Sequence, residues 1–260
     1  MRNFLIGLGV TLFIGACAGG AVPPLGMMAR APEPTVGADA GAIAAAVSDS
    51  RRPQADRDRD AARHPADILA FVHVMPGMRI ADVGPGGGYY TRLFAVAVGD
   101  TGRVYGIDRP NRAPDQPRAS LAVAAQYNNV SIVQQGYQGW TVDQPLDVIF
   151  ISQIYHDFHV PAANLDVPAI DRGMFAALRP GGELIVIDHS AVSGFDPART
   201  DEVHRIDQAV VRRELEAVGF MYVDESQVLR NPADTRTERV FESDIRGHTD
   251  QFVMRFRKPA

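Results

Sequence analysis

The chain has 260 residues, 46% of them hydrophobic and 22% charged, which is the balance of an ordinary globular protein long enough for one α/β domain. The formal net charge is −5 and no block of basic residues occurs, so the composition argues against a nucleic-acid partner. Cys17 is the only cysteine, which excludes a disulfide framework within the chain.

The N-terminus has the layout of an export signal. Arg2 precedes an uncharged apolar run over residues 4–14, which is too short and too rich in glycine for a comfortable transmembrane helix. The tetrapeptide Ile-Gly-Ala-Cys that ends at Cys17 resembles the bacterial lipobox. This resemblance implies that Cys17 is lipidated and that the protein is exported to the cell envelope, in the periplasm, with a lipid anchor in a membrane. A plain signal peptide and an uncleaved anchor remain alternatives.

The domain organisation follows from composition. Residues 1–17 are expected to be a signal peptide with a lipobox, and residues 18–50, rich in Ala, Gly and Pro, a flexible tether. The folded domain is expected over residues 51–260. It starts with an Arg/Asp run over residues 51–63 that is typical of a solvated helix, and Pro65 opens a second helix with an apolar face. These helices are expected to form a lid over the ligand site, or else to cover the sheet edge.

Strand and helix patterns alternate from residue 79 onward. Strands are expected at residues 79–83, 102–108, 130–134, 146–151, 184–188, 220–228 and 251–257. Helices are expected at residues 89–98, 118–127, 162–178 and 201–218, with a polar loop over 229–250. Alternation of this kind predicts a parallel sheet covered by helices on both faces.

A glycine-rich turn joins the first strand to the next helix, with Gly84, Gly86 and Gly88 following Asp82. Glycines let the backbone approach a ligand, and the helix start supplies free N–H groups, so the turn predicts a nucleotide-type site. A phosphate-binding loop would end in Gly-Lys-Ser/Thr, which is missing. A dinucleotide site would need glycine at Tyr89, and the Asp82 carboxylate would repel a pyrophosphate.

The pattern Asp82-x-Gly84-x-Gly86-x-Gly88 instead resembles motif I of class I S-adenosylmethionine-dependent methyltransferases. The strand at 146–151 with the following Ser-Gln, and the segment Leu-Arg-Pro-Gly-Gly-Glu-Leu at 178–184, are similar to later motifs of that superfamily. The Tyr-His-Asp-Phe and His-Arg-Ile-Asp motifs, together with the C-terminal tail, are similar to a group of bacterial predicted methyltransferases that often carry export signals.

This resemblance implies a Rossmann-like α/β fold: a seven-stranded, mostly parallel sheet of order 3-2-1-4-5-7-6, with strand 7 antiparallel and helices on both faces. It implies S-adenosylmethionine as the cofactor, whose ammonium and sulfonium suit a nearby acid. Asp108, at the end of the second strand, can accept hydrogen bonds from the ribose hydroxyls, although a dinucleotide enzyme would place an acid there too. Gln135 follows the third strand, where many members direct an acid at adenine. The implied cofactor contacts are Asp82, Gly84, Gly86, Gly88, Asp108, Gln135 and Ser152.

Three histidines are candidates for catalysis: His156 first, then His189 and His204. His156 and His189 follow expected strands, and His204 is expected to share a helix face with Asp207. A general base is needed only if the methyl acceptor carries a proton, and histidine suits that task near neutral pH. Capping and loop hydrogen bonds are the alternative roles. A metal site that uses some of these histidines with Asp157 and His159 is conceivable, but spacing alone does not fix one, so no metal ligand is assigned.

The sequence therefore predicts an S-adenosylmethionine-dependent methyltransferase that acts on a small-molecule or undefined acceptor. Two alternatives stay open. One is a catalytically inactive, lipid-anchored domain that binds a nucleoside or a partner, suggested by the export signal and by the missing acid after the third strand. The other is an NAD-dependent oxidoreductase. The oligomeric state is left open.

Overall fold

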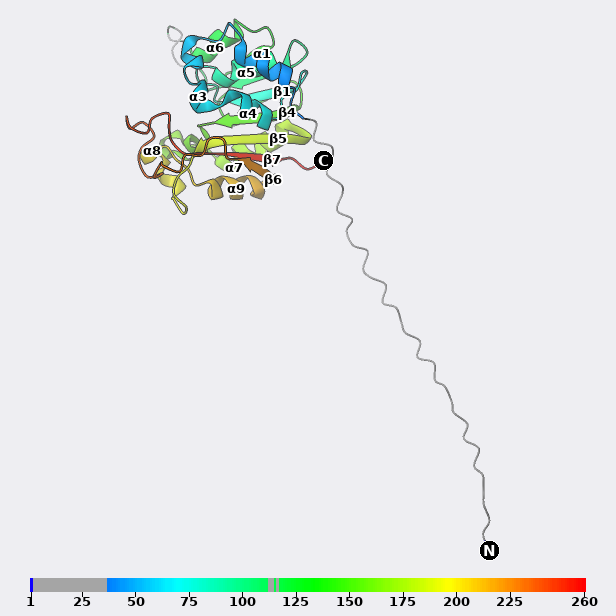
Figure 1. The fold of residues 1–260 in the computed structure, drawn as a ribbon, viewed down its shortest axis with the longest axis vertical. Helices are drawn as coiled ribbons and strands as arrows, with labels where there is room; N and C mark the ends of the chain where they lie inside the picture. Colours follow the sequence, from blue (N-terminus) through cyan, green and yellow to red (C-terminus); the bar gives the residue numbers. More distant parts are fainter. Residues whose placement is uncertain (2–36, 112–114, 116) are drawn as a thin grey trace. The chain divides into compact units, whose positions relative to one another are not determined.

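Seven apolar segments pair into one sheet of order β3-β2-β1-β4-β5-β7-β6 in the computed structural model (Figure 1). The structure describes residue 1, residues 37–111, residue 115 and residues 117–260. The strands are β1 (Arg79–Val83), β2 (Arg103–Ile107), β3 (Val130–Val133), β4 (Leu146–Ser152), β5 (Leu178–His189), β6 (Met221–Ser226) and β7 (Gln251–Arg257). Strands β1 to β5 pair in parallel, whereas β7 is antiparallel to β5 and β6. The predicted fold class is therefore confirmed.

The carboxyl ends of the parallel strands meet at one edge of the sheet. Val83 of β1 is in register with Ile107 of β2 and Ile151 of β4, and Ser152 at the end of β4 is in register with Ile187 of β5. In open α/β sheets, ligands bind outside this edge. The fold alone thus directs the search for a site to the segments that follow β1, β2, β4 and β5.

Helices cover both faces of the sheet (Figure 1). Helices α1, α4 and α5 bury one apolar face, which includes Phe150 and Ile185, and helices α7 and α9 bury the other, which includes Ile149 and Val186. The helices are α1 (Ala40–Ser48), α2 (Gln54–Arg57), α3 (Asp60–Arg63), α4 (Pro65–Phe71), α5 (Tyr89–Val98), α6 (Ala119–Ala124), α7 (Val167–Ala177), α8 (Thr200–Val203) and α9 (Gln208–Ala217), with short 3₁₀ turns η1 (Tyr155–His159), η2 (Pro161–Ala163) and η3 (Pro197–Arg199).

The predicted tether over residues 18–50 is wrong at its C-terminal end, because residues 40–48 form α1. Asp39 caps this helix by accepting a hydrogen bond from the backbone N–H of Ala42 at 2.9 Å. Ile43 and Ala46 are buried in the layer formed with α4 and α5. The segment lacks a wide apolar stripe, but alanine has the highest helix propensity and its small side chain allows close packing.

The predicted signal peptide, the lipobox at Cys17 and the first part of the tether lie outside the described residues. Within the part of the chain that the structure describes, no helix combines the length and hydrophobicity that crossing a bilayer requires. Lipidation of Cys17 therefore stays a prediction.

The helix predicted over residues 201–218 is two helices, α8 and α9. His204 ends α8 in the left-handed backbone region, with φ 54° and ψ 48°. The chain then runs beside β5, where the N–H of Ile206 donates to the carbonyl of His189 at 3.0 Å. Asp207 caps the start of α9. His204 and Asp207 therefore do not share a helix face, because backbone pairing with the end of β5 overrides the helical periodicity.

The prediction of a solvated helix over residues 51–63 is wrong. This Arg/Asp run forms two short helices, α2 and α3, that are held by buried ion pairs. Arg52, which is buried, donates to Asp60 at 2.9 Å. The carboxylate of Asp56 is also buried and lies 2.9 Å from the guanidinium of Arg92 in α5. Because Arg92 belongs to α5, its ion pair with Asp56 attaches this charged segment to the rest of the domain.

Candidate functional site

A cavity of about 770 Å³ lies at the carboxyl ends of β1 and β4. Its volume is within the range of small-molecule sites, and its position is the one that the sheet topology favours. Its walls come from the glycine turn after β1, from α3, from the segments after β2 and β3, and from η1, η2 and α8. Six residues singled out in the sequence line it: Asp82, Gly84, Gly86, Ser152, Asp157 and His204.

The glycine turn needs glycine at all three alternating positions. Gly84, Gly86 and Gly88 have φ values of 74°, 54° and 85°, which side chains rarely adopt. A Cβ at Gly84 would lie 2.3 Å from Ile154, and one at Gly88 would lie 2.3 Å from Val123, whereas one at Gly86 would meet nothing within 4 Å. Gly86 lines the cavity and Gly88 does not, so Gly86 leaves room for a ligand while Gly88 permits packing.

Gly88→Ala is expected to destabilise the domain by about 1–3 kcal/mol more than Gly86→Ala. Both changes place a Cβ in the left-handed region, which costs roughly 1–2 kcal/mol in each. Only Gly88→Ala also overlaps Val123, a buried β-branched side chain with little rotamer freedom. Urea unfolding of both variants measures the difference, and equal midpoints would contradict the packing role of Gly88.

Asp82 is a buried carboxylate on the cavity wall. It accepts a hydrogen bond from Thr91 Oγ1 at 2.6 Å. Burial raises its pKa to about 6, and the Thr91 hydrogen bond and the positive charge of Arg63 oppose that rise. Among the described residues none forms an ion pair with Asp82. The side chain is therefore mostly ionised at neutral pH and able to pair with a cationic group of a ligand.

Asp108 directly follows β2, one residue beyond the strand in which it was expected, and it does not line the cavity. Its buried carboxylate accepts from Ser120 Oγ at 2.6 Å and lies 2.7 Å from the guanidinium of Arg118. Arg118 lies on the cavity wall. Arg118, and not Asp108, is therefore the residue of this pair that a ligand in the cavity would meet, and the ribose contact at Asp108 stays a prediction.

Gln135 lies away from the cavity. Its exposed side chain accepts a hydrogen bond from the backbone N–H of Thr141 at 3.0 Å, within its own loop. The next residues, Gly136 and Tyr137, line the cavity instead. Ser152, at the end of β4, is on the cavity wall as expected. The sequence pattern thus predicted that the loop after β3 contributes to the site, but it did not predict which residues of that loop line the cavity.

Arg63 and its partners are site residues that the sequence did not single out for binding. Its guanidinium donates to Gln153 Oε1 at 2.7 Å and lies 4.9 Å from the ring centroid of Tyr89. Gln153, with a left-handed φ of 60°, in turn donates to Gln251 of β7 at 3.0 Å. These contacts place the end of α3 on the cavity wall. The sequence offered one indication of this part of the site. Tyr89 and Tyr90 directly follow the glycine turn, and the guanidinium of Arg63 lies over their rings.

His156 lies in η1 behind the cavity wall, between two carboxylates. Its Nδ1 is 2.8 Å from Asp188 Oδ1 and its Nε2 is 3.2 Å from Asp157 Oδ1. Burial opposes the charged form, but Asp188 and Asp157 outweigh it and raise the pKa of His156 to about 10. At neutral pH the ring therefore carries both protons, which makes His156 a hydrogen-bond donor and not the general base that we expected.

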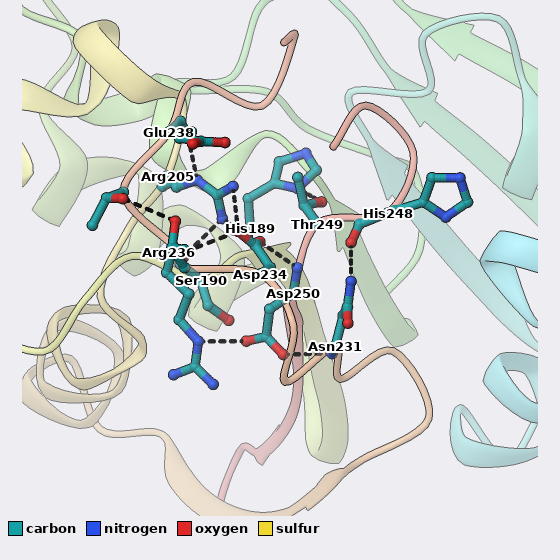
Figure 2. Close-up of polar contacts among 12 residues, drawn as sticks. His189, Ser190, Arg205, Asn231, Asp234, Arg236, Glu238, His248, Thr249 and Asp250 are labelled. Carbon is teal, nitrogen blue, oxygen red and sulfur yellow. Dashed lines mark hydrogen bonds and ion pairs between the residues drawn. The ribbon is translucent and has the colours of Figure 1, made fainter. Parts of the chain in front are cut away.

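His189 does not line the cavity. Figure 2 shows its ring beside Thr249, whose Oγ1 lies 2.7 Å from His189 Nδ1. Burial lowers the pKa of His189 to about 4. The structure therefore does not bring His189, a predicted catalytic candidate, to the cavity.

His204 reaches the cavity wall from the C-terminus of α8. Its ring centroid lies 5.4 Å from that of His156 in an edge-to-face arrangement, and its Nδ1 is 3.6 Å from Asp157 Oδ1. Burial and the nearby charge of His156 lower the pKa of His204. Of the three candidate histidines, His204 alone combines a neutral ring with access to the cavity.

The sheet order, the glycine turn and the carboxylate beside it define a class I S-adenosylmethionine-dependent methyltransferase, with S-adenosylmethionine as its cofactor. The chain belongs to the protein-L-isoaspartate(D-aspartate) O-methyltransferase family, whose sequence profile matches residues 54–223. It is similar to protein-L-isoaspartate O-methyltransferase 1 of Arabidopsis thaliana, with 36% identity over 120 residues, which make up 44% of this chain and 47% of that protein. The chain thus spans about half the length of this relative.

Solved structures share the fold. A SAM-dependent methyltransferase from Aquifex aeolicus aligns with a TM-score of 0.56 and 18% identity, over 85% of this chain and 98% of its own. The N-methyltransferase NodS from Bradyrhizobium japonicum WM9, in complex with S-adenosyl-L-homocysteine, aligns with a TM-score of 0.54 and 14% identity over the same shares. The identification removes the alternative of an NAD-dependent oxidoreductase.

Proposed function

We propose that this protein transfers the methyl group of S-adenosylmethionine to a carboxylate presented by a protein or peptide. The family to which the chain belongs supports a protein acceptor in place of the small molecule expected from the sequence. The observation that carries the proposal is the set of arginines on the cavity wall: Arg59, Arg63, Arg109 and Arg118.

Arginines of this kind suit an anionic acceptor. Arg118 and Arg59 are already paired with Asp108 and Asp56. Within residues 37–111, 115 and 117–260, Arg109 has no ion-pair partner. The planar guanidinium matches a carboxylate with two parallel hydrogen bonds. We therefore assign the acceptor carboxylate to Arg109.

A carboxylate also fits the protonation states of the site. One carboxylate oxygen attacks the methyl carbon, the carbon–sulfur bond breaks, and S-adenosylhomocysteine and a methyl ester result. No proton leaves the acceptor, so no general base is required. A protonated His156 is compatible with this step, and catalysis then rests on the positions of the two reactants.

The position of His204 supports a second candidate function, which is methyl transfer to a hydroxyl or an amine. Its neutral ring on the cavity wall is able to take a proton from a hydroxyl or amine acceptor. Such an acceptor would give an ether or an N-methyl product. The two candidates therefore differ in product chemistry, since a methyl ester is cleaved by mild alkali and the other products are not.

The test uses the chain with methyl-labelled cofactor and a peptide that carries isoaspartate, compared with the same peptide carrying aspartate. We expect incorporated label that alkali releases as methanol. Arg109→Gln is expected to raise the KM for the peptide about tenfold, as loss of a charged hydrogen bond predicts, and the exposed Arg246→Gln serves as its control. Alkali-stable label would favour the second candidate, and no transfer would favour an inactive binding domain.

We also propose that the protein is exported and anchored through a lipid on Cys17. Support comes from the sequence pattern of the N-terminus alone, together with the resemblance to bacterial predicted methyltransferases that carry export signals.

A further inference from the structure

Three side chains come together at the cavity wall: Asp157 of η1 and His204 at the end of α8, which line the cavity, and His156 of η1, which lies behind the wall. Each of the three offers one atom that could bind a metal, and these three atoms all lie within 4.8 Å of one another. His156 Nε2 is 3.2 Å from Asp157 Oδ1, which is 3.6 Å from His204 Nδ1. Ligands bound tetrahedrally to Zn²⁺ at about 2.0–2.1 Å are separated by about 3.3 Å. The two distances to Asp157 are close to this value.

A carboxylate supports His156 from behind, as is usual for histidines that bind metals. His156 Nδ1 is 2.8 Å from Asp188 Oδ1, and Asp188 Oδ2 accepts from the backbone N–H of His156 at 2.8 Å. Asp188 is fully buried at the end of β5 and also accepts from the backbone N–H of His189. This arrangement fixes the ring and directs Nε2 toward Asp157 and His204.

The cluster is closed on one side and open on the other. His156 is buried, whereas Asp157 and His204 line the cavity. An ion between them would have three protein ligands and a fourth position facing the cavity. That is the arrangement of catalytic zinc sites, because structural sites use four protein ligands.

The backbone of His204 is held in a costly conformation. With φ 54° and ψ 48° it is left-handed, which persists only where the surroundings impose it. Its ring packs between His156 and Phe241, with centroids at 5.4 and 4.9 Å. Strained residues of this kind cluster at binding and active sites.

We propose that His156, Asp157 and His204 bind a divalent transition-metal ion of the zinc class, which displaces the proton from His156 Nε2, with its fourth position open to the acceptor. Two imidazoles and one carboxylate are a donor set that suits Zn²⁺ and also Co²⁺. The ion would bind an oxygen of the acceptor and so hold the acceptor in position beside the cofactor, and this role rests on the proposed methyl transfer. The binding of the ion does not depend on that proposal.

The experiment is titration of the untagged, chelator-treated chain with Co²⁺ alone, without cofactor or acceptor, followed by displacement with Zn²⁺. We expect one equivalent of Co²⁺ to bind with the visible absorption of a tetrahedral site. His204→Ala and Asp157→Asn, whose side chains are partly exposed, are expected to lower the affinity at least 100-fold, and Asp188→Asn by about 10–100-fold through the orientation of His156.

His159→Gln is the matched control, because His159 also faces one carboxylate, that of Glu214 at 3.1 Å, but lies outside the three-residue cluster. This variant should bind Co²⁺ as the parent does. Absence of stoichiometric binding, or binding that survives His204→Ala, would overturn the proposal and leave a simple histidine–carboxylate ion pair. Peptide methylation is measured separately, so a failure of either proposal is recognised independently of the other.

Discussion

Asp82→Asn is expected to lower the affinity for S-adenosylmethionine about 10- to 100-fold and to lower kcat/KM with it. The change keeps the shape of the side chain and an acceptor for the Thr91 hydroxyl, but removes the charge that faces the cavity. A hydrogen bond to a charged group contributes roughly 1.5–3 kcal/mol, which corresponds to this loss. Calorimetry with S-adenosylhomocysteine, which keeps the ammonium group, measures it.

The same carboxylate predicts how binding depends on pH. Burial raises the pKa of Asp82 to about 6, so the side chain becomes neutral as the pH falls below that value. Affinity is therefore expected to be higher at about pH 8 than at about pH 5, and this difference should vanish in Asp82→Asn. The free energy of unfolding of the cofactor-free domain is expected to depend on pH in the opposite direction. A carboxyl with a raised pKa stabilises at low pH, and its contribution is lost as the pH rises through about 6.

Asp67→Asn is the control for this prediction, because it removes a carboxylate whose side chain is 63% exposed on α4. It should bind the ligand as the parent does. Unchanged affinity in Asp82→Asn would show that the cofactor ammonium is held elsewhere and would contradict the assignment of Asp82.

Asp234→Ala is expected to destabilise the domain by about 3–5 kcal/mol, as removal of one partner from a buried ion pair does. Arg205 is completely buried, and its guanidinium pairs with both oxygens of Asp234, at 2.8 and 3.1 Å. Figure 2 shows this pair within a network that holds the loop between β6 and β7, where Asp234 also accepts from the backbone N–H of Asp250 at 2.6 Å. The alanine variant leaves the Arg205 charge buried without its carboxylate.

Urea unfolding measures the loss, with Glu202→Ala as the control. Glu202 pairs with Arg199 on the surface, where both side chains are about half exposed and water screens the pair, so this change is expected to have little effect on stability. The double variant Arg205→Met/Asp234→Leu should be less destabilised than Asp234→Ala, because it leaves no buried charge. A loss below about 1 kcal/mol in Asp234→Ala would show that water reaches Arg205.

Local signals in the chain were sufficient for the fold and for the position of the cofactor turn. Short apolar strands that alternate with helices have few ways to pack other than as a parallel sheet covered by those helices. The glycines with Asp82 and the strand-end positions depend on neighbours in sequence, and the structure places Asp82, Gly84, Gly86 and Ser152 on the cavity wall. Helix α1 was missed because its burial comes from α4 and α5, which no local pattern reports.

The chemistry of the histidines was decided by tertiary contacts. In the sequence, His156, His189 and His204 are equivalent residues that follow strands or occupy a helix. The fold gives His156 a buried carboxylate 32 positions away, turns His189 toward Thr249, and brings His204 to the cavity by breaking a helix. The sequence by itself therefore determined that this protein has a methyltransferase fold with a cofactor turn at Gly84–Gly88. Only the tertiary structure decided which groups are charged there, because a pKa depends on burial and on neighbours that the chain brings together from afar.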